Sequence, residues 1–274
     1  MATYTSPATT SRPRAGLLAA RHIAGGPLST VVVLLGLWAL AVMLFNLPAY
    51  LLPSPWAVIG QWWVNLPALL PHALATASVI LLGYGCAILL AIPLALAIAF
   101  FPFAARTVYP GIVMLQNVPK IAIAPLFVIW FGFGLAPKVL LVFLITFFPI
   151  MVSATSGFRA LPREILDFVR STGAGSWTIF RLVRLPAALP QVFVGLRIAA
   201  TVAPTAAIVA EFVASDQGLG YLLLRYNGDL NTTMSFAAIL TLGMIGVSLF
   251  SAIEFAERLM TRRRGATMKS DASN

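Results

Sequence analysis

The chain has 274 residues, of which 60% are hydrophobic and only 9% are charged. Soluble domains carry roughly a quarter charged residues, so this composition excludes an ordinary soluble domain. Apolar runs of about 20 residues cross a bilayer as helices. The sequence therefore predicts an all-α, polytopic membrane protein.

The net charge of +10 does not indicate nucleic-acid binding, because the basic residues gather before the first apolar run and after the last one. That distribution is typical of cytoplasmic segments and of contact with anionic lipid. The residues concerned are Arg12, Arg14, Arg21, Arg258, Arg262, Arg263, Arg264 and Lys269. The single cysteine, Cys86, excludes an intrachain disulfide.

Six apolar segments predict six membrane spans. The first is too long for the apolar core of a signal peptide and precedes no clear cleavage site, so we expect it to be retained. The second should tilt, kink at Gly83, Gly85 or Pro93, or project beyond the membrane. The segments are Leu28–Leu47, Ala73–Phe101, Tyr109–Phe133, Lys138–Thr155, Leu189–Phe212 and Met234–Ala256.

The connections between these segments separate by charge. With the amino terminus inside, the inner loops hold Arg106, Arg159, Arg163, Arg170, Arg181 and Arg184, whereas the outer loops hold only Lys138 and Arg225. This asymmetry predicts that both termini are cytoplasmic. We divide the chain into a cytoplasmic tail (residues 1–27), a transmembrane domain (28–257) and a basic cytoplasmic tail (258–274). The uncharged first outer loop carries three tryptophans and should lie along the outer interface.

The longest predicted cytoplasmic connection, residues 158–188, has the pattern of a folded unit. Leu161, Ile165, Phe168 and Val169 form one apolar face of a short amphipathic helix. We expect the helix to end in "STGAGS", where Gly173 and Gly175 supply positive-φ or close-approach positions, and Ser176 to cap a second helix over "WTIFRLVR". Pro186 and Pro190 should stiffen the return to the fifth span. An ordinary interfacial loop is one interpretation, and a docking surface is the other.

The residues of this loop resemble a known family. The loop is similar to the EAA loop of ABC importer permeases, whose pattern is Glu-Ala-Ala-x3-Gly-x9-Ile-x-Leu-Pro. The corresponding residues in this chain are Asp167-Phe168-Val169-x3-Gly173-x9-Val183-x-Leu185-Pro186. The glycine, the spacing and the Leu-Pro match, whereas Asp, Phe and Val replace Glu-Ala-Ala. The segments "VPKIAIAPLFVIWFGFGLAPK", "RLPAALPQVFVGLRIA" and "QGLGYLL" resemble the nitrate/sulfonate/taurine branch.

The resemblance implies a type I importer permease fold in the inner membrane of a bacterium. It also implies three partners: a cytoplasmic ATPase dimer, an extracytoplasmic substrate-binding protein and a second permease copy. The chain has no G-x-x-x-x-G-K-[ST] loop, so ATP and Mg²⁺ are expected on the ATPase and no cofactor on this chain. The residues implied in ATPase coupling are Glu164, Asp167, Phe168, Arg170, Gly173, Ala174, Ser176, Leu185 and Pro186.

Polar residues within the spans are candidates for the translocation path, because buried charges in membranes usually face a cavity or a partner. Lys120, with Gln116 and Asn117 one turn earlier, has a path role or a structural pairing role. Glu211 has a path role or a structural hydrogen bond. Arg197 is expected to snorkel or to contact a carbonyl.

Small residues recur along the fifth span at Gly195, Ala199, Ala203 and Ala207. This spacing allows close helix packing, within the chain, between two permease copies or at a moving gate.

A stand-alone secondary transporter or channel is the alternative function. It would need inverted repeats and more intramembrane acids than Glu211 and Glu254. An intramembrane enzyme lacks paired catalytic residues. The branch that the chain resembles handles small anions such as nitrate, sulfonates and taurine, with relatives for thiamine-precursor pyrimidines and riboflavin. The segments "PKIAIAPLFVIWFGFGLAPK" and "GLGYLLLRYNGDLNTTMSFAAI" are closer to these last relatives.

Overall fold

The computed structural model describes residues 15–271, with side chains for residues 29–213 and 215–261. Arg12 and Arg14, and the side chains of Arg21, Arg262, Arg263, Arg264 and Lys269, lie outside the described residues. Every element in the described part is helical. The elements are α1 (Ala15–Leu44), α2 (Pro55–Val64), α3 (Leu66–Phe100), α4 (Pro102–Gln116), the 3₁₀-helix η1 (Lys120–Ile123), α5 (Ala124–Phe131), α6 (Leu135–Arg159), α7 (Arg163–Ser171), α8 (Ser176–Ile179), the π-turn η2 (Phe180–Arg184), α9 (Leu185–Ala214), α10 (Leu219–Gly228) and α11 (Thr232–Asp271).

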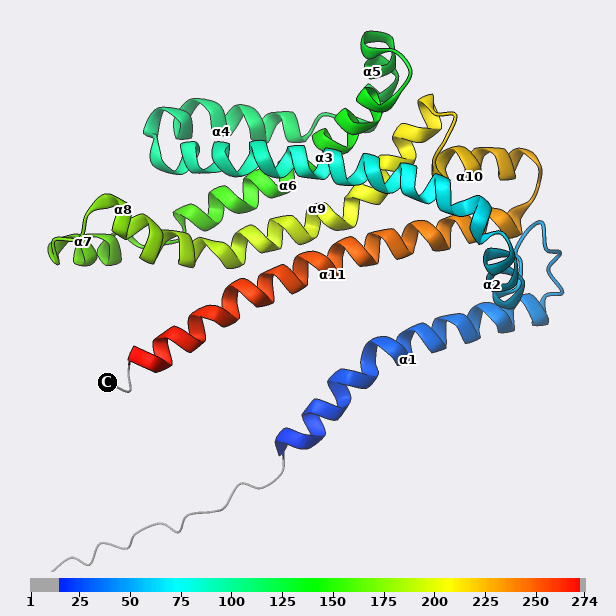
Figure 1. Ribbon diagram of the computed structural model, residues 1–274, viewed down its shortest axis with the longest axis horizontal. Helices are drawn as coiled ribbons and strands as arrows, with labels where there is room; N and C mark the ends of the chain where they lie inside the picture. Colours follow the sequence, from blue (N-terminus) through cyan, green and yellow to red (C-terminus); the bar gives the residue numbers. More distant parts are fainter. Residues whose placement is uncertain (1–14, 272–274) are drawn as a thin grey trace, which may run out of the picture.

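The centre of the molecule is a bundle in which α6 packs against both α3 and α9 (Figure 1). Its core contains Ile80 of α3, Ile150 and Met151 of α6, and Ala203 of α9, all fully or almost fully buried. α11 packs on α9, and α4 packs on α3. α7 and α8 lie at one end of the bundle, the α7 end, and α10 lies at the other, the α10 end (Figure 1).

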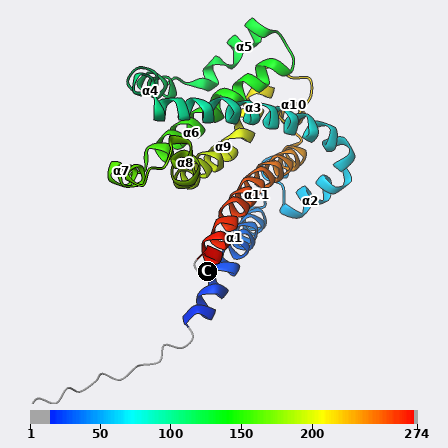
Figure 2. The same ribbon diagram turned by 60° about the vertical axis from the view of Figure 1, so that its left-hand side comes forward.

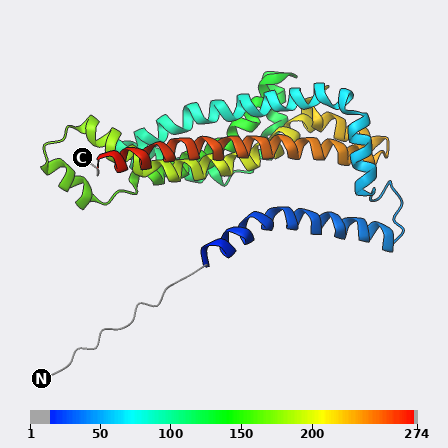
Figure 3. The same cartoon turned by 60° about the horizontal axis from the view of Figure 1, so that its bottom comes forward.

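α1 stands apart from the bundle, on the side of α11 (Figure 3). Figure 2 shows α4 and α5 on the opposite side of the molecule. The described side chains of α1 are largely exposed, and the ring of Trp38 lies 5.5 Å from that of Phe236 in α11. Because apolar side chains such as Val32 and Leu34 have no protein cover, this face of α1 needs lipid or another chain against it.

Four helices in the described residues are long and apolar enough to cross a membrane, and the bent pair α4 with η1–α5 makes a fifth if it counts as one span. The described apolar part of α1, Ser29–Leu44, is shorter. These helices confirm a multi-pass membrane protein, whereas the predicted number of six spans stays a prediction. The four are Leu66–Phe100, Leu135–Arg159, Ser176–Val213 and Thr232–Thr261.

The third predicted span, Tyr109–Phe133, is not one continuous helix. The chain bends by 84° between Pro102–Gln116 and Lys120–Phe131. Proline disfavours the helical conformation at the preceding residue and has no N–H to donate, so Pro119 ends α4 at Asn117. The second proline, Pro125, then occupies the first turn of α5, where its missing N–H costs nothing.

The second predicted span is the single long helix α3. Its 35 residues extend about 52 Å, which exceeds the roughly 30 Å of a bilayer core. Gly83, proposed as a kink point, has a packing role instead, because a Cβ there would lie 2.6 Å from Val142 Cβ of α6. α3 therefore continues through both glycines and Pro93 as one element.

The small residues of the fifth span pack within the chain. Ala199, Ala203 and Ala207 of α9 are completely buried, and a Cβ on Gly195 would lie 2.6 Å from Ser153 Cβ of α6. Of the three alternatives left open by the spacing, the structure supports close intrachain packing of α9 against α6.

The first outer loop contains the short helix α2. The Ser54 side chain accepts a hydrogen bond from the Ala57 N–H, and Pro55 occupies the first turn, so a cap and a proline start the helix together. Trp56 and Trp63 are exposed, whereas Trp62 Nε1 donates to Thr241 Oγ1 of α11 at 3.0 Å. Two tryptophans thus remain free to contact a membrane interface, as the sequence predicts for this loop.

Candidate functional site

The predicted amphipathic helix of residues 158–188 is α7. None of its residues is buried, and its apolar face is open, with Ile165 46% and Phe168 72% exposed. Asp167 and Arg170 form an ion pair of 3.1 Å along the same helix. Because the bundle does not cover the apolar face of α7, that face remains available to another chain.

The turn that ends α7 depends on Gly173. Its φ is +79°, a value that side-chain-bearing residues rarely adopt, and its N–H donates to Arg170 O at 3.0 Å. The Thr172 hydroxyl also donates to Val169 O at 2.7 Å, so the last carbonyls of the helix are satisfied locally. Gly175 has φ of −66° and a Cβ there would meet nothing within 4 Å, so the expectation of a positive φ or a close approach there was wrong.

The second predicted helix is not separate from the fifth span. Gly175 is the N-cap residue of α8 and Ser176 is its first helical residue, so the predicted cap by Ser176 was also wrong. α8 passes through the π-turn η2 into α9, and Ser176–Val213 is one continuous helix. In the π-turn Leu185 N–H donates to Phe180 O, five residues back, and Pro186, which has no N–H to donate, follows directly.

This continuity places the coupling candidates on two rigid parts. The first part is α7, which carries Glu164, Asp167, Phe168 and Arg170. The second part is the long helix, which begins at Ser176 and carries Leu185 and Pro186 further along. The turn between the two parts contains Gly173 and Ala174. Ile179 is buried, and the rings of Phe180 and Phe100 lie 5.7 Å apart, which ties the start of the long helix to the end of α3. A force on α8 is therefore transmitted to α9 without an intervening loop.

Three of the path candidates meet at the break in the third span. Lys120 Nζ donates to Gln116 O at 2.7 Å and lies 4.6 Å from the ring centroid of Phe148 in α6. The Asn117 side-chain amide donates to Val113 O at 3.5 Å. Lys120 thus satisfies a carbonyl that the end of α4 leaves unpaired, and Gln116 and Asn117 are exposed beside it.

Glu211, the fourth path candidate, lies in a different cluster, near the α10 end. It is 1% exposed, and it accepts hydrogen bonds from Thr76 Oγ1 of α3 at 2.8 Å and from Gly220 N–H of α10 at 2.7 Å. The Thr76 hydroxyl in turn accepts from Leu219 N–H at 2.8 Å. Of the two roles left open, the structure shows structural hydrogen bonds that join α3, α9 and α10.

Gly218 completes this cluster. Its φ is +107°, and a Cβ at this position would overlap the carboxylate of Glu211. Its N–H donates to His72 Nδ1 at 3.0 Å, and the His72 ring stacks on Tyr221 at 6.0 Å between centroids. The loop between α9 and α10 is therefore held by side chains from α3 as well as by its own glycines.

Sequence reasoning missed the partners in this cluster. Lys138 was assigned to an outer loop, yet it is 4% exposed and donates to Ser215 Oγ at 2.9 Å. The Ser215 hydroxyl donates to Gln217 O. The one signal in the sequence for this cluster is the pair of glycines in "QGLG", shortly after Glu211, since glycines allow another part of the chain to approach the backbone closely.

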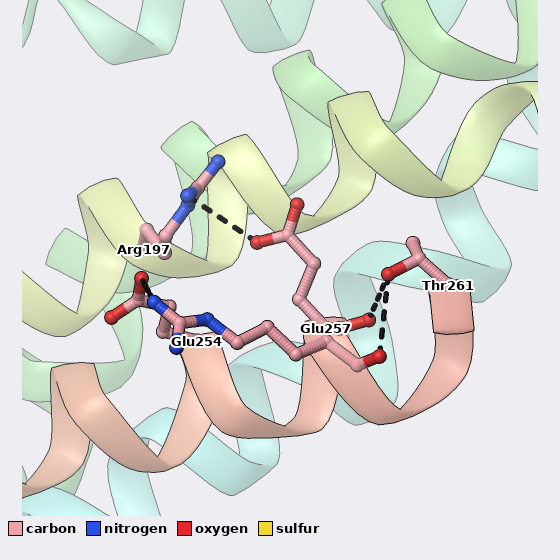
Figure 4. A network of polar contacts seen from close by, with 5 residues as sticks. Arg197, Glu254, Glu257 and Thr261 are labelled. Atoms are coloured by element: carbon pink, nitrogen blue, oxygen red, sulfur yellow. Dashed lines mark hydrogen bonds and ion pairs between the residues drawn. The ribbon is translucent and has the colours of Figure 1, made fainter. Parts of the chain in front are cut away.

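Arg197 does not merely snorkel. Its Nη1 lies 3.3 Å from Glu257 Oε2 of α11 (Figure 4). Glu254, one turn earlier on α11, pairs with Arg258 at 2.7 Å. The Arg197 guanidinium of α9 and the Glu257 carboxylate of α11 thus neutralise each other.

The described part of the chain is thus a multi-pass helical bundle with α7 and its turn at one end and a break in one span. Residues 87–264 match the family described as "Binding-protein-dependent transport system inner membrane component". Because the match covers more than half of the chain, the protein belongs to this family of inner-membrane ABC transporter permeases. The class and the branch predicted from the loop and span sequences are confirmed.

Individual relatives agree with this assignment. The chain is 37% identical to the riboflavin transport system permease protein RibX of Chloroflexus aurantiacus, over 85% of this chain and 88% of that protein. It is 33% identical to the formylaminopyrimidine transport permease protein ThiX of Halalkalibacterium halodurans, over 84% and 92%. These two relatives are of the riboflavin and thiamine-precursor kinds that the sequence favoured.

The fold has a counterpart among solved structures. A chain of the methionine ABC transporter MetNI in an inward-facing conformation superposes with a TM-score of 0.55, over 71% of this chain and 95% of that one, at 19% identity. The likeness shows a shared fold, the type I importer permease. The protein is thus the permease subunit of a binding-protein-dependent ABC importer, a membrane component that works with an ATPase and a substrate-binding protein.

Proposed function

We propose that α7 and the Gly173 turn dock into a separate cytoplasmic ATPase dimer, which binds ATP and Mg²⁺ and moves the spans by pulling on this loop. The observation that carries the proposal is that Phe168 is 72% exposed on α7, a helix that the Gly173 turn joins to the long helix Ser176–Val213. An aromatic ring held in solvent is costly unless a partner covers it. The continuous helix Ser176–Val213 then carries the motion into the bundle core.

We also propose that the α7 end faces the cytoplasm and that both termini lie on that side. Charge distribution supports this orientation: Arg159, Arg163 and Arg184 lie at the α7 end, whereas Lys138 and Arg225 are the basic residues near the α10 end in the described part of the chain. With α1 and the bent pair as further crossings, the chain makes six spans, as the sequence predicts.

A complete importer then requires a second copy of this permease. α4 and α5 lie on the side of the molecule opposite α1 (Figure 2), and they expose large apolar side chains, among them Met114, Ile129 and Trp130. We propose that two copies associate as a homodimer and that the substrate-binding protein docks at the α10 end. Gln116, Asn117 and Lys120, exposed or half-exposed at the broken span, then line the path between the copies.

The substrate that we propose is a small heteroaromatic molecule of the riboflavin or formylaminopyrimidine kind. The support is the 37% and 33% identity to permeases named for those two compounds. Polar groups at the break, such as the Lys120 ammonium beside the Phe148 ring, suit a planar solute with hydrogen-bond acceptors.

The test is uptake by proteoliposomes that contain the permease, its ATPase and its binding protein. We expect riboflavin or a formylaminopyrimidine to be taken up only with internal ATP and with the binding protein present. Uptake by the permease alone, without ATP, would instead identify a secondary transporter. ATP-driven uptake of taurine or an aliphatic sulfonate, with neither heteroaromatic compound carried, would overturn the substrate class and leave the docking proposal intact.

A further inference from the structure

The α7 end contains a cavity of about 440 Å³ that the coupling role does not explain. Its walls come from four segments that are distant in sequence: the turn between α3 and α4, the end of α6, the start of α7 and the π-turn η2. Its lining includes the apolar residues Phe101, Pro102 and Phe158 and the cationic residues Arg159, Arg163 and Arg184. A cavity lined by both apolar and cationic side chains is suited to an amphiphilic anion.

The positive charge of this cavity is not balanced. In the part of the chain with described side chains, no carboxylate lies within ion-pair distance of Arg159, Arg163 or Arg184. An adjoining cavity of about 320 Å³ shares Arg163 and Arg184 and adds Arg170, whose charge Asp167 neutralises. Three arginines therefore line a small volume without a counter-ion among the described side chains.

Two of the arginines are held in position by the bundle. The guanidinium carbon of Arg184 lies 4.7 Å from the ring centroid of Phe100. Arg159 Nη2 donates to Ile98 O at 3.1 Å, and its guanidinium carbon lies 5.6 Å from the ring centroid of Tyr109. A stacked or anchored guanidinium keeps most of its five N–H donors free and loses little entropy on binding a phosphate.

We propose that this cavity binds the phosphate head group of an anionic phospholipid from the leaflet at the α7 end. The proposal rests on the orientation given under the proposed function. A phosphodiester accepts charge-assisted, bidentate hydrogen bonds from arginine, and basic cavities between spans on the cytoplasmic side suit such head groups. Phe101, which lines the cavity and is 64% exposed, then receives the acyl chains, which a free phosphate lacks.

The lipid and the ATPase use different faces of α7. The cavity is lined by Arg163 and Leu166, whereas Ile165 and Phe168, the exposed apolar residues proposed to dock, do not line it. A bound lipid therefore braces α7 against the α3–α4 turn from behind and leaves the docking face open.

The experiment measures lipid binding without transport. The full-length permease is placed in nanodiscs of phosphatidylcholine with increasing phosphatidylglycerol, and retained lipid is counted by native mass spectrometry. We expect saturable retention of phosphatidylglycerol over phosphatidylcholine, weakened about five-fold by Arg163→Gln or by Arg184→Gln. Arg181→Gln, in the same π-turn but outside both cavities, is the matched control and should retain lipid as the unchanged protein does.

Three results would overturn the proposal. Equal retention of both lipids, or equal weakening by Arg181→Gln, would show general surface attraction only. Displacement of the lipid by millimolar inorganic phosphate or glycerol 3-phosphate would show a site for free phosphate. Loss of the lipid when the ATPase is added would assign the arginines to that protein interface. Because no readout involves uptake, failure of this proposal is distinct from failure of the proposed function.

Discussion

Arg197 and Glu257 form an ion pair between α9 and α11, with Nη1 3.3 Å from Oε2 (Figure 4). Their side chains are 32% and 19% exposed, so the pair is better shielded from solvent than the neighbouring pair of Glu254 and Arg258, whose side chains are 38% and 70% exposed. Since α11 otherwise meets α9 through apolar contacts, this pair sets the register of the two helices at the α7 end.

We expect Arg197→Ala to lower the free energy of unfolding by about 1 kcal/mol, because the half-buried Glu257 carboxylate loses its partner. The measurement is a double-mutant cycle with Glu257→Ala, followed by thermal unfolding in detergent. The exposed Arg258 and Glu254 pair should give a coupling energy of only about 0.3–0.5 kcal/mol. Equal coupling energies for both pairs would show that the helix–helix pair has no special role.

Gly218→Ala should destabilise the protein by at least about 2 kcal/mol, because the added Cβ overlaps the Glu211 carboxylate and the positive φ is unfavourable for alanine. The control is Gly228→Ala at the end of α10, where a Cβ meets nothing within 4 Å. The measurement is the melting temperature of both variants in the same detergent. A Gly218 variant as stable as the control would mean that the loop moves aside without cost.

Glu211→Gln tests the same cluster from the other side. A glutamine retains one acceptor for the Thr76 hydroxyl but presents an amide N–H₂ or a shared oxygen to Gly220 N–H, so a buried donor loses its bond. We expect a loss of about 1–3 kcal/mol in the free energy of unfolding. Retained stability with abolished uptake would instead point to a direct role of Glu211 in transport.

Gly173→Val should leave membrane insertion unchanged and weaken ATPase binding about tenfold, because a left-handed φ costs a residue with a Cβ about 1–2 kcal/mol. Gly175→Val is the matched control, since Gly175 has an ordinary φ of −66° and an open surrounding. The measurement is the affinity of the ATPase for permease in nanodiscs. Equal affinities for the two variants would remove the turn from the docking unit.

Phe168→Ala should weaken ATPase binding without changing thermal stability, since the ring contacts little in the isolated chain. Phe133→Ala, an exposed phenylalanine on another part of the molecule, provides the comparison in the same binding assay. A large drop in melting temperature for Phe168→Ala would show that the ring packs within this chain and is not a docking residue.

Lys120→Met should slow uptake while the complex stays assembled, because the ammonium is lost both from the proposed path and from the Gln116 carbonyl. Lys120→Arg retains a cation and a donor and should recover part of the rate. Initial uptake rates in proteoliposomes, with ATPase binding as the assembly check, separate the two effects. Unchanged uptake by Lys120→Met would confine Lys120 to the structural role at the end of α4.

Local patterns in the sequence determined the class of protein, its helical nature and the position of the loop that is proposed to dock. Hydropathy alone specifies spans, because a bilayer admits only apolar runs whose backbone is bonded internally. The spacing of apolar residues predicted α7 correctly, and the glycine of the turn has the positive φ expected of it, since both depend on neighbours within a few residues.

Contacts between distant segments were decided only by the tertiary structure. Thr76 and Glu211 are 135 residues apart, and neither sequence position indicates the other. Lys138 was placed in a loop by its charge, although burial beside Ser215 makes it part of the folded core. The pair of Arg197 with Glu257 likewise depends on how whole helices pack. Hydropathy and periodicity specify which surfaces are buried, whereas the partner of each buried polar group depends on which helices meet.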